Sequence, residues 1–325
     1  MKILFLNRAK MEGRFSFEEL FLTIKPFLNN CEIIDYYNNP KISFIKNIKH
    51  VRSINSDVIH ITGGVGYFTL LLSKKKTIVT FHDTNHLEFD LVGLKKFVFK
   101  LVYYTIPIKR AKYITVVSNY TKERIISLFN IDEKKLVVIP NCYPLDFKTN
   151  EKKTISTCVK ILQIGTKSNK NISSLIKAIV GLNIELTIIG KLNDELIELL
   201  KKNSINYINK FNLSREEIYN EYVNTDILAF ISLREGFGLP ILEANIVGRA
   251  IITSNQTSLP EVAGNSAHIV NPYNIDEIRA GIIKLSTNDE YRNQLIINGF
   301  QNLKRYSPEL TSSLYFNLYK SIKSE

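Results

Sequence analysis

Two acidic residues, Glu235 and Glu243, enclose a glycine-rich turn in the segment Glu-Gly-Phe-Gly-Leu-Pro-Ile-Leu-Glu. The short apolar run Ile227–Ile231 just before it predicts a buried strand. Pro240 suits the first position of a following helix, and Gly248 suits the position just past its end. A helix start offers unpaired N–H groups and partial positive charge, which suit a diphosphate. Ionised carboxylates only accept hydrogen bonds, so the pattern also predicts contacts to sugar or ribose hydroxyls.

The complete segment resembles the E-x7-E signature of glycosyltransferase family 4, whose members are retaining enzymes with two Rossmann-like domains. Three later segments match the family in order and spacing: Gly248–Ser254, Ser258–Gly264 and Val270–Asn274. A bare Glu-x7-Glu spacing means little in a chain with 31 acidic residues, and an ordinary turn with incidental acids is the alternative. The resemblance implies that Glu235 contacts the hydroxyls of a donor sugar and that Glu243 binds the ribose. It also implies donor contacts from Gly236, Phe237, Gly238 and Leu239.

A lysine-rich turn, Gly165-Thr-Lys-Ser-Asn-Lys-Asn, follows the predicted strand Val159–Ile164. Basic groups in such a turn suit a diphosphate, although a solvated lysine-rich loop is the alternative. The family holds the donor diphosphate here with a basic pair, and the resemblance implies that role for Lys170. Many members have Arg where this chain has Thr166 or Asn169, so Lys167 is the candidate partner, without the bidentate fork of Arg. The expected donor-binding residues of this turn are Gly165, Thr166 and Lys167.

A histidine, His82, follows the predicted strand Thr77–Phe81 in the segment His-Asp-Thr-Asn-His. The segment resembles the family loop that faces the donor sugar, which implies a catalytic role for His82. A neutral His could donate to a sugar hydroxyl or stabilise developing charge, whereas a satisfied loop pair is the alternative. His86 is a weaker candidate. The first loop, 7–13, has a single Gly where many members are Gly-rich, so acceptor contacts there are not transferred.

The segment 91–110 is the candidate membrane element. At helical spacing, an apolar face is expected from Leu91, Leu94, Phe97, Val98, Leu101, Val102 and Tyr104. The opposite face would present Lys95, Lys96, Phe99, Lys100 and Tyr103. Basic groups beside aromatic rings suit anionic headgroups or a lipid-linked acceptor. The equal alternative is an ordinary amphipathic helix whose apolar face covers the sheet.

Strand-like runs alternate with helical stretches along the 325 residues, which predicts an α/β fold with parallel sheets in two domains. The resemblance implies the GT-B fold, in which two Rossmann-like domains face each other across a cleft. We expect an acceptor-binding domain at 1–148, a nucleotide-sugar-binding domain at 149–304, and a helix at 305–325 that returns to the first domain. The predicted strands are Lys2–Leu6, Val58–Thr62, Thr77–Phe81, Tyr113–Val117, Leu136–Ile139, Val159–Ile164, Glu185–Ile189, Asn206–Ile208, Ile227–Ile231, Ala250–Thr253 and Ala267–Val270.

Composition limits the classes of partner. A formal net charge of +12 suits nucleic acid, an anionic membrane or acidic substrates, or reflects only a Lys-rich composition. Three scattered cysteines indicate a reducing compartment and argue against a zinc site or a disulfide framework. No apolar run reaches transmembrane length, and the apolar start is too short for a signal peptide. We therefore expect a cytoplasmic protein, either free or peripheral on the inner face of the plasma membrane.

The resemblance implies a retaining transferase that moves a sugar from a nucleotide-diphosphate sugar to a glycan or lipid-linked acceptor, and we expect it to act in bacterial cell-surface polysaccharide synthesis. Lys170, Lys167 and the helix start after Gly238 would neutralise charge on the leaving diphosphate. Family members generally need no divalent metal, and the chain has no Asp-x-Asp segment, so neither metal nor cofactor is expected. Two alternatives stay open: another GT-B enzyme, such as an epimerase or phosphorylase, and a non-catalytic basic protein that binds glycan or nucleic acid. Because no nucleic-acid-binding module is recognised, a nucleic-acid partner is not expected.

Overall fold

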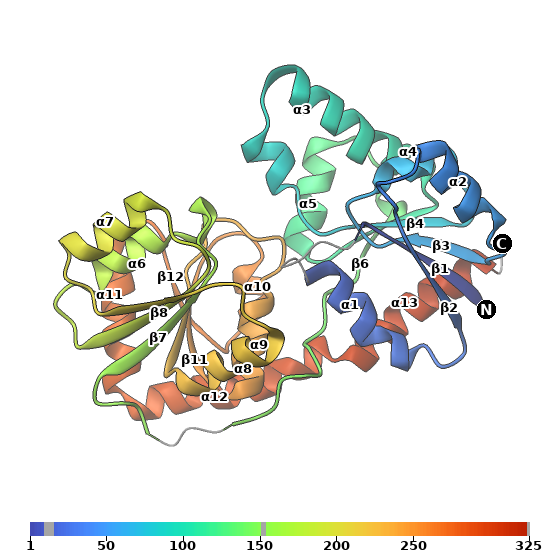
Figure 1. The fold of residues 1–325 in the computed structure, drawn as a ribbon. Helices are drawn as coiled ribbons and strands as arrows, with labels where there is room; N and C mark the ends of the chain where they lie inside the picture. The colour runs from blue at the N-terminus through green and yellow to red at the C-terminus, as the bar shows by residue number, and fades with distance from the viewer. Residues whose placement is uncertain (10–15, 151–153, 324–325) are drawn as a thin grey trace. The chain divides into compact units, whose positions relative to one another are not determined.

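The computed structural model describes residues 1–9, 16–150 and 154–323, and it divides into two units. The N-terminal unit comprises Met1–Cys142 with Ser307–Glu325, and the C-terminal unit comprises Tyr143–Tyr306 (Figure 1). The first boundary lies earlier than the expected position after residue 148. The reason is that Phe147 packs its ring against Tyr219 and Tyr222, at 5.4 and 5.5 Å between centroids, and so belongs to the second unit.

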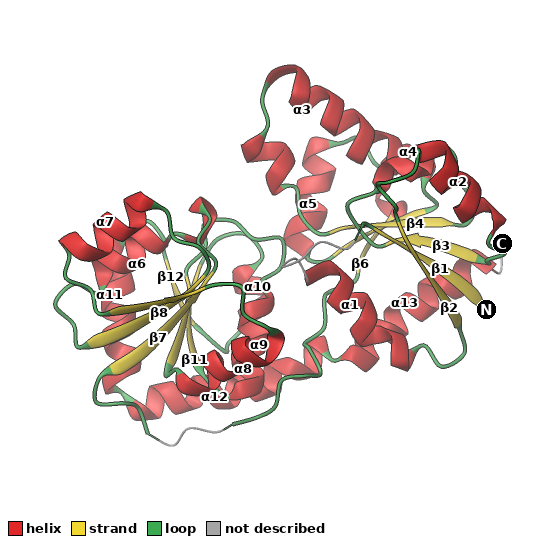
Figure 2. Ribbon diagram, viewed as in Figure 1, coloured by secondary structure: helices red, strands yellow, loops and turns green. Residues whose placement is uncertain are grey.

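The N-terminal unit is built on a sheet of six parallel strands in the order β2-β1-β3-β4-β5-β6 (Figure 2). Its strands are β1 (Lys2–Asn7), β2 (Glu32–Tyr37), β3 (Val58–Ile61), β4 (Thr77–Phe81), β5 (Tyr113–Val116) and β6 (Leu136–Val138). Its helices are α1 (Ser16–Ile24), α2 (Phe44–Ser53), α3 (Gly93–Lys100), α4 (Ile106–Arg110), α5 (Asn119–Leu128) and α13 (Pro308–Lys323). Short helical turns are η1 (Lys25–Phe27), η2 (Gly66–Leu70), η3 (His86–Asp90), η4 (Leu101–Thr105) and η5 (Glu133–Lys135).

The C-terminal unit has a second six-stranded parallel sheet in the order β12-β11-β10-β7-β8-β9. Its strands are β7 (Val159–Ile164), β8 (Ile184–Ile189), β9 (Tyr207–Lys210), β10 (Ile227–Phe230), β11 (Ala250–Ser254) and β12 (His268–Val270). Its helices are α6 (Ile172–Ala178), α7 (Asp194–Lys202), α8 (Arg215–Asn224), α9 (Leu239–Val247), α10 (Leu259–Ala263), α11 (Ile275–Thr287) and α12 (Asp289–Asn302), with turns η6 (Ser168–Lys170) and η7 (Leu303–Tyr306). This strand order is that of the doubly wound nucleotide-binding fold.

The predicted α/β class with parallel sheets is confirmed, and every predicted strand is present with small shifts at its ends. The sequence-based prediction missed β2. This edge strand reads Glu-Ile-Ile-Asp-Tyr-Tyr and has no fully buried residue, so it lacks the apolar run that marks the central strands. No helix among the described residues is long and apolar enough to cross a membrane.

The segment 91–110 forms α3, the π-helical turn η4 and α4, and the predicted facing of its side chains is wrong. Leu94 and Phe97, expected to be buried, are 76% and 65% exposed. Phe99 and Tyr103, expected to be exposed, are partly buried against the core and stack on each other at 4.5 Å. Helical periodicity fixes which residues share a face but not which face meets the core. The wide π-helical turn η4 further interrupts the regular spacing from Leu101 onward. Among the aromatic residues of this segment, only Tyr104 is buried, as expected.

A buried polar network joins α13 to the first sheet. His60 of β3 lies 2.7 Å from the Tyr319 hydroxyl through Nδ1 and 2.7 Å from the Thr80 hydroxyl through Nε2. Thr80 in turn contacts Thr115 at 2.6 Å and Tyr315 at 3.5 Å. Burial, with a smaller effect of the nearby His82, lowers the pKa of His60 from 6.5 to about 3. The ring is therefore neutral over the physiological range.

Replacing His60 by Gln should flatten the pH dependence of stability. The unfolded chain takes up a proton at His60 below pH 6.5, whereas the folded chain takes it up only near pH 3. The contribution of this residue is therefore fully present above pH 6.5 and falls by up to about 1.4 kcal/mol per pH unit as the pH drops from there. Denaturant unfolding at about pH 7 and about pH 5 measures the slope. His50→Gln, at an exposed position of α2, is the control; equal slopes for all three proteins would show that His60 titrates normally.

Candidate functional site

The site lies where the strand order of the second sheet reverses. β7 is the first strand of this sheet along the chain, and in the sheet it lies between β8 and β10. Because parallel strands end at the same edge, the loops after β7 and β10 leave from adjacent positions, and ligands of doubly wound sheets bind at such a reversal. The loop after β7 carries Lys170, and the loop after β10 carries Glu235.

Lys170 and Glu235 form an ion pair with 2.6 Å between Nζ and Oε1, and their side chains are only 19% and 15% exposed. The Lys170 ammonium also lies 4.8 Å from the centre of the Phe230 ring. Gly165 makes room for this lysine, since its φ is +84° and a Cβ there would lie 2.9 Å from Lys170 Cε. The sequence analysis assigned Lys170 to the donor diphosphate and Glu235 to the donor sugar, and in the structure these two side chains contact each other.

The backbone around Glu235 is fixed by side chains that the sequence analysis did not single out. Thr257 Oγ1 accepts from the Glu235 amide at 3.1 Å, and the Ser258 hydroxyl donates to the Glu235 and Phe237 carbonyls at 3.0 and 2.7 Å. Asn169 donates from Nδ2 to the Arg234 carbonyl at 2.9 Å. Their signal in the sequence was weak, because polar residues after a strand are common in loops.

The turn after Glu235 leads into α9 as expected, with small differences at its start. Gly238 has a φ of +121° and precedes the helix, which begins at Leu239, so Pro240 takes the second position instead of the first. A Cβ at Gly238 would lie 2.8 Å from Leu259, so the turn packs closely on α10. Gly248 ends the helix with a φ of +75°. Phe237 is buried and packs edge-on against the Tyr306 ring at 5.6 Å, which makes it a packing residue as well as a candidate donor contact.

Glu243 is buried in α9, and both of its carboxylate oxygens are engaged. Oε1 accepts from Arg215 Nη1 at 2.9 Å, and Oε2 accepts from the Tyr222 hydroxyl at 2.7 Å. Arg215 also forks onto the Asp146 carboxylate with two bonds of 3.1 Å and lies 4.6 Å from the Phe147 ring centre. Burial and the adjacent Glu243 carboxylate raise the pKa of Tyr222 well above its ordinary value. Nothing in local spacing pointed to Arg215, which lies far from Glu243 in the sequence.

The remaining residues of the lysine-rich turn differ in their surroundings. The Lys167 side chain is exposed at the start of η6, and among the described residues no ion pair involves it. Thr166 packs against Gly190, where a Cβ would lie 2.8 Å from Thr166 Cγ2. Close packing of the loops after β7 and β8 therefore depends on this glycine. No group of three His, Cys, Asp or Glu side chains in the described part of the chain could hold a metal ion.

In the N-terminal unit, His82 follows β4 at the carboxyl edge of the sheet and is buried. Its Nε2 lies 2.7 Å from the Thr62 carbonyl, and since a carbonyl only accepts, Nε2 carries the hydrogen. Thr62 Oγ1 in turn donates to Asn7 Oδ1 at 2.7 Å. His86 is exposed and pairs with Asp90 at 3.0 Å, which suits a surface role. Of the first loop, 7–13, residues 10–13 lie outside the described range.

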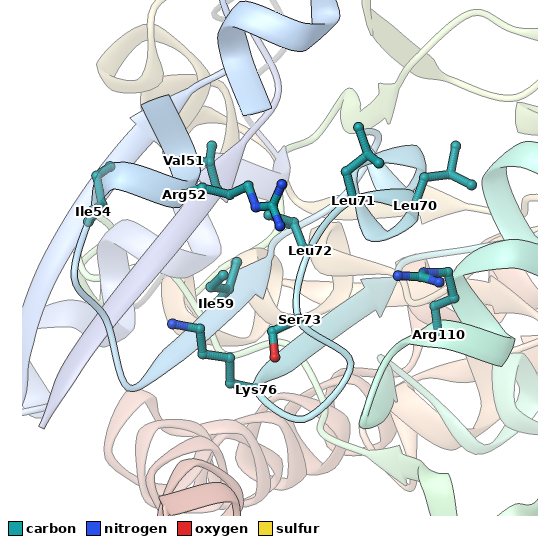
Figure 3. A pocket seen from close by; sticks show the side chains of 10 residues that line it. All are labelled: Val51, Arg52, Ile54, Ile59, Leu70, Leu71, Leu72, Ser73, Lys76 and Arg110. Atoms are coloured by element: carbon teal, nitrogen blue, oxygen red, sulfur yellow. The ribbon is translucent and has the colours of Figure 1, made fainter. Parts of the chain in front are cut away.

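A cavity of about 370 Å³ opens at the other end of this sheet (Figure 3). Arg52, Lys76 and Arg110 line it together with apolar side chains that include Ile59 and Leu72 (Figure 3). Lys76 donates to the Ser56 carbonyl at 2.8 Å, and Arg110 donates to the Thr69 carbonyl at 2.7 Å. These bonds hold loops near the amino ends of the strands. The cavity is therefore separate from the carboxyl edge where His82 lies.

Two family models match adjacent parts of the chain: Glycosyltransferase Family 4 matches residues 25–147, and Glycosyl transferases group 1 matches residues 146–302. O-antigen chain mannosyltransferase B of Escherichia coli is 27% identical over 275 residues, which cover 76% of this chain and 70% of that protein. O-antigen chain mannosyltransferase RfbU of Salmonella typhimurium is 27% identical over 63% of this chain and 59% of its own length. The chain spans only 19% of the serotype-specific mannosyltransferase WbdA of Escherichia coli, at 32% identity.

Solved structures share the fold. Anabaena Alr3699/HepE, in complex with UDP and glucose, superposes with a TM-score of 0.81 at 14% identity, over 99% of this chain and all (100%) of that chain. WaaG, a glycosyltransferase involved in lipopolysaccharide biosynthesis, superposes with a TM-score of 0.71 at 12% identity, over 98% of this chain and 99% of that chain. At these identities the likeness establishes the fold, and with it the predicted pair of Rossmann-like domains.

Replacing Glu243 by Gln should destabilise the C-terminal unit even when no ligand is bound. The substitution removes the negative charge that Arg215 and Tyr222 face, and we expect a loss of about 1–3 kcal/mol in the free energy of unfolding. Glu221→Gln is the matched control, because its pair with Lys210 at 2.6 Å involves a more exposed lysine and should be worth about 0–1 kcal/mol. Denaturant unfolding compares the two variants, and equal losses would contradict a structural role for the Glu243 network.

Proposed function

The chain belongs to glycosyltransferase family 4 and is a GT-B glycosyltransferase, and from this premise we propose that it moves a sugar, with retention, from a nucleotide-diphosphate sugar to a glycan or lipid-linked acceptor. The observation that carries the proposal is the Lys170–Glu235 pair at the strand reversal. The pair combines a cation suited to phosphate with a carboxylate suited to hydroxyls. It lies beside the N-terminus of α9, which favours negative charge.

The geometry supports an exchange of partners on binding. A donor diphosphate would compete with Glu235 for the Lys170 ammonium, and release of Glu235 would leave its carboxylate to accept from sugar hydroxyls. Lys170 and the start of α9 would then neutralise the charge that grows on the departing phosphate. Lys167, being exposed, is the proposed second cation. Glu243 is proposed to reach the ribose from within its network with Arg215 and Tyr222.

Retention is proposed to follow from attack on the same face as the departing phosphate. A covalent sugar–Glu235 intermediate is the alternative, but in the proposed donor complex the released Glu235 carboxylate accepts from sugar hydroxyls instead of attacking the anomeric carbon. His82 is proposed to act on the donor sugar from the N-terminal unit, with its ring held by the Thr62 carbonyl. Neither metal nor cofactor enters the proposed reaction.

Mannose is the first sugar to test, because the relatives named above are mannosyltransferases. The same names support a place in bacterial cell-surface polysaccharide synthesis. A location on the cytoplasmic side, peripheral to the membrane, is part of the proposal. The first experiment is a thermal-shift screen of GDP- and UDP-sugars, since a donor present at about 100 times its Kd should stabilise the fold by about 2.7 kcal/mol. Transfer from the best donor, with the anomeric configuration of the first product read by NMR, then tests retention. An inverted product would reject retention, and a new sugar nucleotide or sugar phosphate would favour an epimerase or a phosphorylase.

Replacing Gly165 by Ala should impair transfer through Lys170. The methyl group would meet Lys170 Cε at 2.9 Å and push the ammonium away from its place. Turnover should fall on the order of 10-fold or more, since small displacements at a reacting centre are costly. Gly181→Ala is the control: its φ of +73° imposes a similar backbone strain, but nothing lies within 4 Å of the added Cβ. If both variants lose turnover equally, backbone strain alone accounts for the effect.

Replacing Lys170 by Met should lower turnover of the sugar donor by about 10²–10³-fold, the range for loss of one group that stabilises transition-state charge. Binding of the bare nucleoside should stay unchanged, because it has no diphosphate for Lys170 to contact. Lys210→Met, which removes the lysine of the Lys210–Glu221 pair, controls for the loss of one ion pair in the same unit. Steady-state kinetics and nucleoside titrations give the two readouts. Equal weakening of nucleoside binding and turnover would mean that Lys170 does not act on the departing phosphate.

A further inference from the structure

The cavity at the amino ends of the strands of the first sheet has the size and lining of a ligand site. Its volume of about 370 Å³ lies in the range of small-molecule sites, roughly 300–1,000 Å³. Val51, Ile59 and Leu72 form an apolar wall and are almost fully buried. Leu70 and Leu71 extend the apolar lining and are 40% and 43% exposed. A ligand with an apolar part would therefore remove apolar surface from water here, which is favourable.

Three cations line the same cavity: Arg52, Lys76 and Arg110. Figure 3 shows Arg52 and Lys76 on one side and Arg110 on the other, with Ser73 between them. No acidic side chain of the described residues is part of the lining. Positive charge beside apolar surface favours ligands that carry both an anionic group and an apolar part.

The three cations keep hydrogen-bond donors for a ligand. Lys76 uses one of its three N–H groups on the Ser56 carbonyl, and Arg110 uses Nε on the Thr69 carbonyl. A carbonyl is neutral, so neither bond cancels the charge of its cation. Arg52 lies exposed in the last turn of α2, and no hydrogen bond or ion pair within the described part of the chain involves it. Its planar fork suits a carboxylate or a phosphate.

The acid closest in sequence to these cations is engaged elsewhere. Asp57 is the one acid of the segments 51–59 and 70–76, and it is not among the residues that line the cavity. Its carboxylate accepts from the Lys2 amide at 2.8 Å and pairs with Lys323 at 3.5 Å. These contacts lower the pKa of Asp57, with the Lys2 amide as the largest cause. Asp57 therefore does not supply the counter-charge of the cavity.

The neighbouring loops at this edge of the sheet are also predominantly basic. Burial lowers the pKa of Lys135, before β6, and the like charges of Lys74 and Lys112 lower it further, while Asp132 opposes them. Glu133 of the same loop forms an ion pair with a lysine of α5 at 4.0 Å. Positive charge thus outweighs negative charge around the cavity, which raises the local concentration of anions.

We propose that this cavity binds a small amphipathic anion. Its carboxylate or phosphate group would lie among Arg52, Lys76 and Arg110, and its apolar part would cover Ile59 and Leu72. The site goes beyond the proposed function and does not depend on it, because it lies in the N-terminal unit, at the edge of the sheet opposite the one that carries the His82 loop. The ligand would join the end of α2, the loop after η2 and the end of α4, so its binding should stabilise the N-terminal unit.

The test is isothermal titration calorimetry of the full chain with hexanoate, hexyl phosphate, hexanol and inorganic phosphate. At least one of the two amphipathic anions should bind with a Kd on the order of 1 mM or below, a value within reach of a ligand of this size. The tighter of the two identifies the head group. Hexanol, which lacks the charge, and inorganic phosphate, which lacks the apolar part, should each bind on the order of 10-fold more weakly.

Variants then locate the binding. Arg52→Gln should weaken the better anion on the order of 10-fold, whereas Arg52→Lys, which keeps the charge, should lose less. Lys46→Gln is the matched control, because it removes one positive charge from an exposed position of the same helix that does not line the cavity. It should bind like wild type. Thermal melting of each variant without ligand checks that it folds, and Arg52→Gln should melt like wild type.

Several outcomes would overturn the proposal. Failure of both amphipathic anions to bind would reject the site, and equal affinity for hexanol or for inorganic phosphate would reject an amphipathic ligand. Equal weakening in Arg52→Gln and Lys46→Gln would mean that the anions respond only to the net charge of +12. Displacement of the bound anion by a nucleotide sugar would place it at the donor site. Unaltered binding in Arg52→Gln would likewise place the anion elsewhere on the protein.

Discussion

The constraint on which the molecule depends is that parallel strands end at one edge of their sheet. In the C-terminal unit this brings the loops after β7 and β10 together, although Lys170 and Glu235 are far apart in the sequence. The strand reversal between them leaves space that a single run of neighbouring strands would not. Glycine is required in both loops: Gly165 leaves room for the Lys170 side chain, and Gly238 lets its loop pack closely on Leu259. The chemistry of the site is local, but its assembly is a consequence of topology.

The charged groups near the site differ in how firmly they are held. Glu243 is fixed by Arg215 and Tyr222, and Arg215 is itself fixed by Asp146. Glu235 instead has its backbone fixed by Thr257 and Ser258, while its carboxylate meets the flexible side chain of Lys170. A network of several bonds is costly to break, whereas one lysine pair can exchange its partner for a phosphate. A site that binds and releases a charged group suits this arrangement, in which the backbone is fixed by several hydrogen bonds and the Lys170–Glu235 ion pair can exchange its partner.

Much of the fold followed from the sequence because the central strands are continuous apolar runs bounded by polar residues. The edge strand β2 escaped notice because its residues are mixed and half-exposed. Glu235 and Lys170 were recognised through their local segments, yet their contact with each other was not, since only the strand order brings them together. Arg215 could not be found, because a residue that pairs with Glu243 from another helix leaves no local pattern. The facing of α3 was misread because periodicity fixes which residues share a face but not which face meets the core, and the π-helical turn η4 broke the regular spacing.

The return of α13 to the N-terminal unit has a consequence for folding. The core around His60 is completed by Tyr315 and Tyr319, and the His60–Tyr319 pair spans 259 positions of the sequence. Such a contact cannot form until the C-terminal unit has been synthesised, and the entropy of closing so long a loop must be offset by folding of the intervening chain. The C-terminal unit is continuous in sequence and can fold first. Folding of this unit shortens the effective loop that the His60–Tyr319 contact must close, so the core of the N-terminal unit depends on a segment that follows the whole C-terminal unit in the sequence.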